Sequence, residues 1–156
     1  MSKLSAAFGK KYESAVAQIR TTSFVIEGFE FRARIPLTAE MMALQNRIAK
    51  VDEEKLKAKF DEMTKELRSN PIEGVEVTED DVIVNGKSTR ELANAVLMME
   101  NRVVEYIRLL VPANGDLSDI TYEEIEAEWP LAVQMEIVQK ISDAIQPGYK
   151  DTRKNS

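Results

Sequence analysis

The fold is decided by a hairpin sequence, SFVIEGFEFRARI, at residues 23–35. Its two halves are rich in aromatic and β-branched side chains, and Glu27-Gly28 between them is typical of a tight turn. In the second half, apolar residues alternate with charged ones, which predicts a strand with one apolar face, ended by Pro36. A lone hairpin is marginal in water, so helices are expected to cover that face.

A basic amphipathic helix is expected before the hairpin. Its apolar residues recur at helical spacing, and Gly9 should weaken it only slightly. Such a helix could lie on a membrane surface, but docking on its own domain or on a second subunit is favoured. The apolar residues are Leu4, Phe8, Tyr12, Ala15 and Ile19.

Two further helices are expected after the hairpin, with a break between them. Thr38 is expected to cap the first. The apolar spacing slips at Asp52, which is followed by two glutamates and resembles a new helix start, and Asn70-Pro71 ends the second helix. The apolar stripes are Met41, Leu44, Ile48 and Val51 in the first helix, and Leu56, Phe60, Met63 and Leu67 in the second.

A second short β element is expected at residues 75–86, with strands at 76–78 and 82–84. Asn85-Gly86 then forms a turn, and Ser88 with Glu91 forms a capping box that opens a long helix. The apolar stripe of this helix runs as far as Leu110, and Pro112 is expected to end it.

Two C-terminal helices complete the expected fold. Thr121 and Glu124 form a second capping box, with Ile120 and Ile125 as a hydrophobic staple, and this short helix runs to Trp129-Pro130. The last helix has the stripe Leu131, Met135, Val138, Ile141 and Ile145 and stops at residues 146–148.

The sequence therefore predicts a single α+β, mainly α-helical domain over residues 1–148. An N-terminal helix and a β-hairpin are followed by several packed amphipathic helices and a second short β element. The polar segment 149–156 is expected to be a flexible tail.

Composition argues against an enzyme, because the 156 residues include no histidine and no cysteine. This removes the usual acid–base group, the thiol nucleophile and the common zinc and haem ligands. The acidic runs at 79–81 and 123–128 fit a turn and a first helical turn better than a metal site, and no phosphate-loop spacing occurs. No cofactor and no metal are expected; a small carboxylate-dependent enzyme is the remote alternative.

Charge is unevenly distributed around a net value of -6. Residues 1–36 carry six basic and three acidic side chains, whereas residues 109–139 carry seven acids and no Lys or Arg. Nucleic acid is a poor partner for such a chain. No apolar run approaches the ~20 residues that cross a bilayer, and no signal-peptide core is visible. A cytoplasmic protein without a membrane partner is expected.

Several apolar side chains are candidates for contacting a partner protein. Trp129, the only tryptophan, fits either a core anchor between the C-terminal helices or an interface hot spot surrounded by acids. Methionine pairs on helices suit adaptable binding surfaces, because one member of each pair leaves the core stripe. The predicted contact residues are Phe8, Tyr12, Met42, Met98, Trp129 and Met135.

The chain as a whole resembles the tail assembly chaperones of long-tailed bacteriophages and prophages. The resemblance rests on the order of elements and on five stretches. They are SKLSAAFGKK (2–11), TSFVIEGFEFRARIPL (22–37), ENRVVEY (100–106), LVPANG (110–115) and EWP (128–130).

The resemblance implies a non-enzymatic function in the cytoplasm of the bacterial host. Members of the family bind the long, helix-rich tape measure protein, keep it soluble and are absent from the mature virion. A longer form made by ribosomal frameshifting often recruits the major tail tube protein, and self-association into a homo-oligomer is common. The alternative is a structural tail or head-completion component that stays in the virion.

Overall fold

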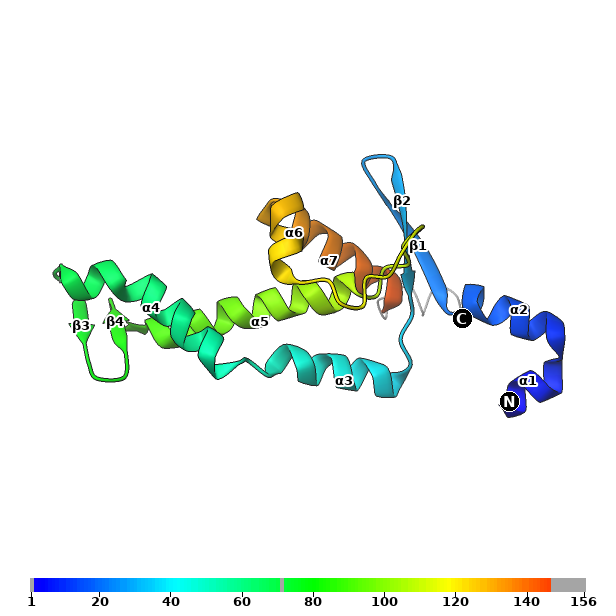
Figure 1. Ribbon diagram of the computed structural model, residues 1–156, viewed down its shortest axis with the longest axis horizontal. Helices are drawn as coiled ribbons and strands as arrows, with labels where there is room; N and C mark the ends of the chain where they lie inside the picture. The colour runs from blue at the N-terminus through cyan, green and yellow to red at the C-terminus, as the bar shows by residue number, and fades with distance from the viewer. Residues whose placement is uncertain (1, 71, 147–156) are drawn as a thin grey trace, which may run out of the picture. The chain divides into compact units, whose positions relative to one another are not determined.

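The computed structural model describes residues 2–70 and 72–146, and the contacts divide the chain into two compact units. Among the described residues, the first unit comprises 2–42 and 103–146, and the second comprises 43–70 and 72–102. The helices α3 (Thr38–Ala49) and α5 (Thr89–Ile107) each run from one unit into the other. The predicted class, α+β and mainly α-helical, is confirmed (Figure 1). The single domain over residues 1–148 stays a prediction.

The first unit is built on the predicted hairpin. β1 (Thr21–Ile26) and β2 (Phe29–Arg34) pair antiparallel. The turn residues Glu27 and Gly28 have φ angles of 50° and 78°, which suits the right-handed twist of the strands. Both strands contact α7 (Leu131–Ile145), so a helix covers the hairpin as expected.

The long helix α5 ends at Ile107, so the prediction that it continues to Pro112 is wrong. Beyond it, the chain lies antiparallel to β2, with Ala33 opposite Leu110. The N–H of Arg34 donates to the carbonyl of Leu109 over 2.7 Å, and the N–H of Val111 donates to the carbonyl of Arg32 over 2.8 Å. The edge of β2 thus hydrogen-bonds to the carbonyl of Leu109 and the N–H of Val111, two groups that would form helical hydrogen bonds if α5 continued.

Gly9 divides the predicted N-terminal helix, so its effect is larger than expected. Its φ angle of 81° separates α1 (Lys3–Phe8) from α2 (Lys10–Ile19). Ser2 caps α1 by accepting from the N–H of Ser5. Neither helix contains a buried residue.

The start of α3 is tied to the hairpin by charge. Thr38 is the first residue of α3 and not its cap, because the carbonyl of Leu37 already accepts from the N–H of Met41. Glu40 accepts from Arg34 and, over 2.8 Å, from Arg20. The hydrogen bond from Arg34 lowers the pKa of Glu40 below its ordinary value, so this carboxylate is ionised near neutral pH.

The second unit contains the predicted break and the second β element. Asp52 caps α4 (Glu53–Ser69), with its carboxylate accepting from the N–H groups of Glu54 and Lys55. The short strands β3 (Val75–Val77) and β4 (Val82–Val84) pair antiparallel. The turn predicted at Asn85-Gly86 is confirmed and leads into β5 (Lys87–Ser88), which was not predicted.

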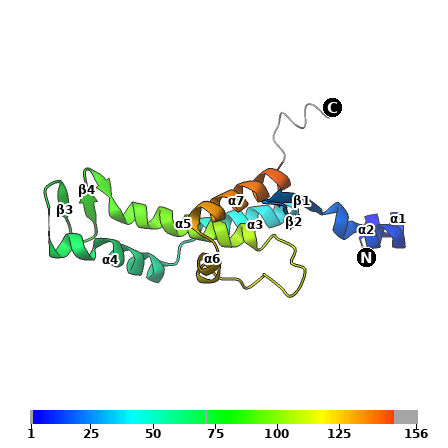
Figure 2. The same ribbon diagram turned by 90° about the horizontal axis from the view of Figure 1, so that it is seen from above.

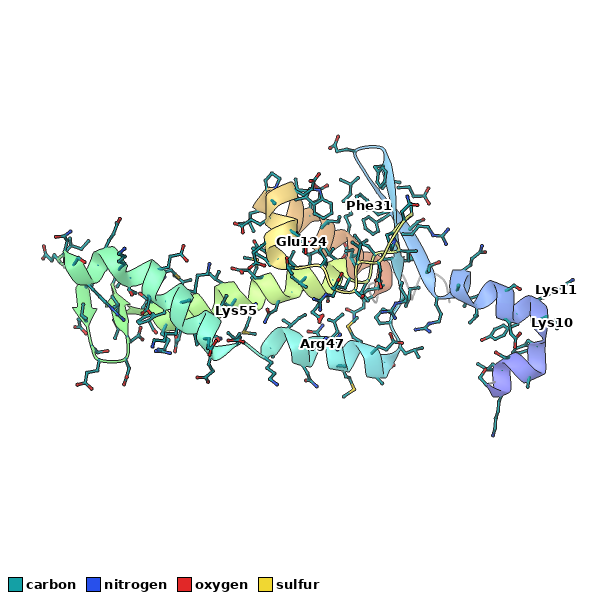
Figure 3. The ribbon with its side chains drawn as sticks, viewed as in Figure 1. Lys10, Lys11, Phe31, Arg47, Lys55 and Glu124 are labelled. Atoms are coloured by element: carbon teal, nitrogen blue, oxygen red, sulfur yellow. The ribbon has the colours of Figure 1, made fainter. Side chains whose placement is uncertain are left out.

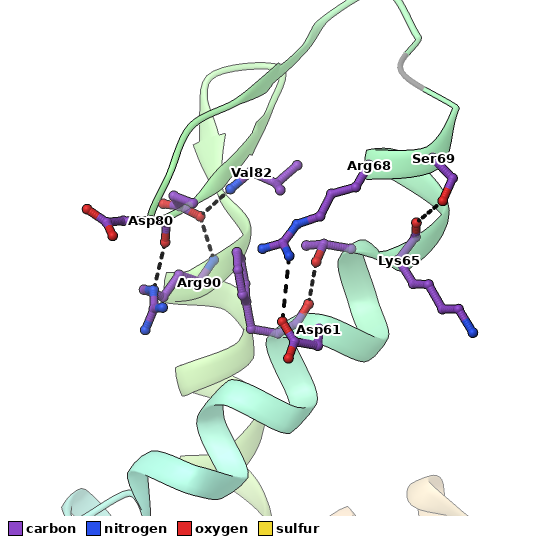
Figure 4. Close-up of polar contacts among 10 residues, drawn as sticks. Asp61, Lys65, Arg68, Ser69, Asp80, Val82 and Arg90 are labelled. Atoms are coloured by element: carbon purple, nitrogen blue, oxygen red, sulfur yellow. Dashed lines mark hydrogen bonds and ion pairs between the residues drawn. The ribbon is translucent and has the colours of Figure 1, made fainter.

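The core of the second unit centres on Phe60, Val82 and Ala93, all nearly inaccessible to solvent. Side chains from α4, β3 and β4 complete it: Leu56, Met63, Leu67, Val75 and Val84. Around this core, Arg68 pairs with Asp61, and Arg90 donates to the carbonyl of Asp80 (Figure 4).

Asp81 joins β4 to the start of α5. Its carboxylate accepts from the N–H of Val82 (2.7 Å), the N–H of Arg90 (3.0 Å) and the hydroxyl of Ser88. The Ser88 hydroxyl in turn accepts from the N–H of Glu91, one half of the predicted capping box. Desolvation disfavours ionisation of Asp81, but these hydrogen bonds outweigh it and lower its pKa.

We expect Asp81→Ala to lower the free energy of unfolding by about 1–3 kcal/mol at pH 7, because two backbone donors lose their charged acceptor. The folded-state pKa is depressed, so this stability is present above the unfolded-state pKa and is lost as the pH falls through the folded-state value. Urea denaturation of both proteins at pH 7 and in acid measures it. A difference that persists unchanged in strong acid would contradict the assignment.

The capping box of α6 (Tyr122–Glu128) is confirmed in both directions, between Thr121 and Glu124. Asn70 and Gln146 end α4 and α7. The roles predicted for Pro71, for residues 147–148 and for the tail 149–156 lie outside the described residues.

Candidate partner-binding site

A hollow of about 390 Å³ lies in the first unit, beside the outer edge of β2. Pockets of a few hundred Å³ with mostly apolar walls are typical of binding sites. The walls come from three separate segments of the chain. They are Phe29, Glu30, Phe31 and Arg32 of β2; Leu110, Val111, Pro112, Ala113 and Leu117 after α5; and Trp129 after α6.

A row of aromatic rings forms one side of this hollow. Trp129 meets Phe31 edge to face, with ring centroids 6.5 Å apart and planes at 81°. Phe31 in turn lies 4.8 Å from Phe29 and 5.5 Å from Phe24. Trp129 is half-buried and Phe29 is 63% exposed, so the row faces both the domain and the solvent. Rings in such a position offer rigid apolar area to a partner.

Gln134 holds the main chain at Trp129, a role the sequence analysis missed. Its side chain is 1% exposed. The amide donates to the carbonyl of Trp129 over 2.9 Å, and its oxygen accepts from the hydroxyl of Tyr122 over 3.0 Å. The signal was present, because Gln134 falls at helical spacing with Val138 and Ile141 on the buried face of α7. The stripe residues Leu131 and Met135 are instead 53% and 38% exposed.

We expect Gln134→Leu to lower the free energy of unfolding by about 1–3 kcal/mol, because the buried amide's hydrogen bonds to the carbonyl of Trp129 and to the hydroxyl of Tyr122 are lost. Gln139→Leu on the same helix is the matched control. Gln139 is exposed and bonds only to Asp143 among the interactions described, so its loss should stay within about 0.5 kcal/mol. Chemical denaturation followed by circular dichroism measures both. Equal losses would contradict the role given to Gln134.

The segment that supplies most of the walls of the hollow is acidic, whereas the charged residues of the lining itself are one acid, Glu30, and one base, Arg32. Residues 109–139, which supply six of its ten lining residues, carry seven acids and no basic residue. The hydrogen bond from the N–H of Ser118 lowers the pKa of Asp116, which keeps this loop carboxylate charged near neutral pH. Glu126 and Glu128 of α6 are exposed beside Trp129 in the sequence. The aromatic walls therefore favour a partner with an apolar anchor, and the acids of residues 109–139 favour basic residues beside that anchor.

The six predicted contact residues do not form one surface. Phe8 and Tyr12 lie together, with ring centroids 5.5 Å apart, and Phe8 is 64% exposed. Met42 is 65% exposed on α3. Met98 belongs to the second unit, where it is half-buried and its sulfur lies 3.5 Å from the amide of Asn94. Of the six, Trp129 alone lines the hollow; Met135 is partly exposed on α7.

The comparisons with protein-family models, curated proteins and solved structures give no match. In the part of the chain that the structure describes, no three or more acidic side chains are grouped so that they could hold a metal ion. Nor does any helix among residues 2–70 and 72–146 combine the length and apolar character needed to cross a membrane.

Proposed function

We propose that this protein is a bacteriophage tail assembly chaperone that binds the tape measure protein in the hollow beside Trp129. The proposal rests on the resemblance of the chain to that family, and the aromatic hollow is the observation that supports it. Binding takes place in the cytoplasm of the bacterial host. The chaperone keeps its client soluble, helps to recruit tail tube subunits through a longer form, and leaves before the virion is complete.

The chemistry of the hollow suits a helical client. An amphipathic helix presents apolar side chains at about one-turn intervals along one face, and a groove with aromatic walls can bind these side chains. The partly exposed rings of Phe29 and Trp129 provide those walls. The client contributes apolar surface that would otherwise aggregate, and the acids of residues 109–139 keep the complex soluble.

Affinity capture from cells that express the phage tail genes tests the proposal. We expect mass spectrometry to recover a very long, helix-rich protein with the tagged chain, with the tube protein also present where the longer form is made. Proteomics of purified virions should lack the chain. Recovery of the chain from finished particles would instead support a structural virion component, and recovery of the chain alone would contradict chaperone function.

A further inference from the structure

The N-terminal arm, residues 3–19, presents apolar side chains that stay largely exposed in the part of the first unit that the structure describes. Leu4, Phe8 and Ile19 are 56%, 64% and 61% exposed, and neither α1 nor α2 buries a residue. Helices of six and ten residues are marginal on their own in water. Most helical stability comes from packing an amphipathic face, so the arm needs a surface to lie on.

The arm is also basic. Lys3, Lys10 and Lys11 make no ion pair among the residues that the structure describes. Arg20, at the end of the arm, is bound to Glu40. The arm thus combines an aromatic pair, Phe8 with Tyr12, and free lysines. An aromatic anchor suits the aromatic hollow, and lysines suit the acidic segment 109–139 that supplies most of its walls.

The arm of a given copy leads away from that copy's own hollow. Arg20 anchors it at the base of the hairpin, where the carbonyl of Arg20 accepts from the N–H of Ile35. From there α2 contacts β1, and the arm projects on the side of the hairpin opposite α6 (Figures 1 and 2). Lys10 and Lys11 lie far from Glu124 of α6 (Figure 3).

We propose that the N-terminal arm docks in the Trp129 hollow of a second copy of the chain. Phe8 and Tyr12 pack against the aromatic row, and Lys10 and Lys11 lie against the acids at the end of α6. Charge complementarity fixes the orientation, and burial of the rings supplies the affinity. Each such contact joins two different surfaces, the arm of one copy and the hollow of another. Two reciprocal contacts about a two-fold axis close a dimer, and head-to-tail docking closes a ring.

The same hollow would then receive either a second copy or the client. The proposal does not depend on the identity of the client, because it rests on the arm and the hollow of this chain. Its consequence is competition: a client that fills the hollow displaces the arm. Removal of residues 1–19 should therefore abolish self-association without weakening client capture.

Sedimentation velocity of the purified full chain over a concentration series tests the docking. We expect wild-type protein to self-associate and Phe8→Glu to weaken the association at least about tenfold, as for a buried aromatic anchor. Ile72→Glu is the matched control, because Ile72 is equally exposed, at 63%, but lies in the second unit. It should associate like the wild type. Wild-type protein that stays monomeric throughout, or a Phe8→Glu variant that associates normally, would overturn the proposal.

A charge exchange identifies the two surfaces and shows that they belong to different copies. Lys10→Glu/Lys11→Glu gives a copy with an acidic arm, and Glu126→Lys/Glu128→Lys gives a copy with basic residues at the end of α6, next to Trp129 in the sequence. Each variant alone should associate several-fold more weakly, and an equimolar mixture should recover association. Lys55→Glu/Lys57→Glu, with the same charge change on exposed residues of α4, is the control. Failure of the mixture to recover would overturn the assignment of the hollow, whatever client capture shows.

Discussion

Replacing Trp129 by alanine is expected to weaken capture of the tape measure protein by about thirtyfold or more, the loss typical of an interface hot spot. The indole lies edge to face with Phe31 at one end of the aromatic row, and its removal opens the wall of the hollow. The fold should persist, because Gln134 bonds to the carbonyl of Trp129, which alanine keeps.

Quantitative pull-down or interferometry with the purified client measures this loss. Trp129→Phe should retain most of the affinity, because it keeps a ring in the wall. Val77→Ala is a control of another kind, since Val77 is 49% exposed in the second unit. If Trp129→Ala and Val77→Ala bound the client equally well while circular dichroism showed both folded, the hollow would not be the client site.

Replacing Phe60 by alanine is expected to lower the free energy of unfolding by about 3–5 kcal/mol. Phe60 is 2% exposed at the centre of the second unit, and the guanidinium groups of Arg68 and Arg90 lie 4.9 and 5.1 Å from the centre of its ring. The change leaves a cavity and removes both cation–π contacts.

Urea denaturation followed by circular dichroism measures the loss. Phe29→Ala removes the same atoms from a side chain that is 63% exposed, and should cost well under half as much. Fluorescence of Trp129 adds a second observation, because it reports on the first unit only. Coincident transitions by both probes would support the predicted single domain, and separate transitions would contradict it.

Local sequence patterns were enough for several elements of the fold. Glu27-Gly28 forms the hairpin turn, Asp52 caps α4, and Thr121 with Glu124 forms a capping box. Each of these signals acts within about four residues, through a positive φ angle or a side chain that accepts from a nearby N–H. Such interactions depend only on neighbouring residues, so the sequence predicts them.

The candidate site could be predicted only in part. Trp129 stood out because it is a lone tryptophan among acids, and the structure places it in the hollow. Its contact with Phe31 could not be predicted, because about 100 residues separate the two and no local pattern states that they meet. The burial of Gln134 could have been predicted, because it is a polar residue on the apolar face of a helix. Its hydrogen bonds to the hydroxyl of Tyr122 and the carbonyl of Trp129 could not.

The sequence by itself determined most of the helices, the hairpin with its turn at Glu27-Gly28, and the acidic and basic segments, since these follow from the order of neighbouring residues. Only the tertiary structure decided where α5 ends, which face of α7 is buried, and that residues 110–117 close a hollow against β2. The stripe of α5 would allow a helix to Leu110. The main chain of Leu109 and Val111 instead hydrogen-bonds to the open edge of β2. These bonds can replace those of a longer helix only after residues 109–111 have come to lie beside β2.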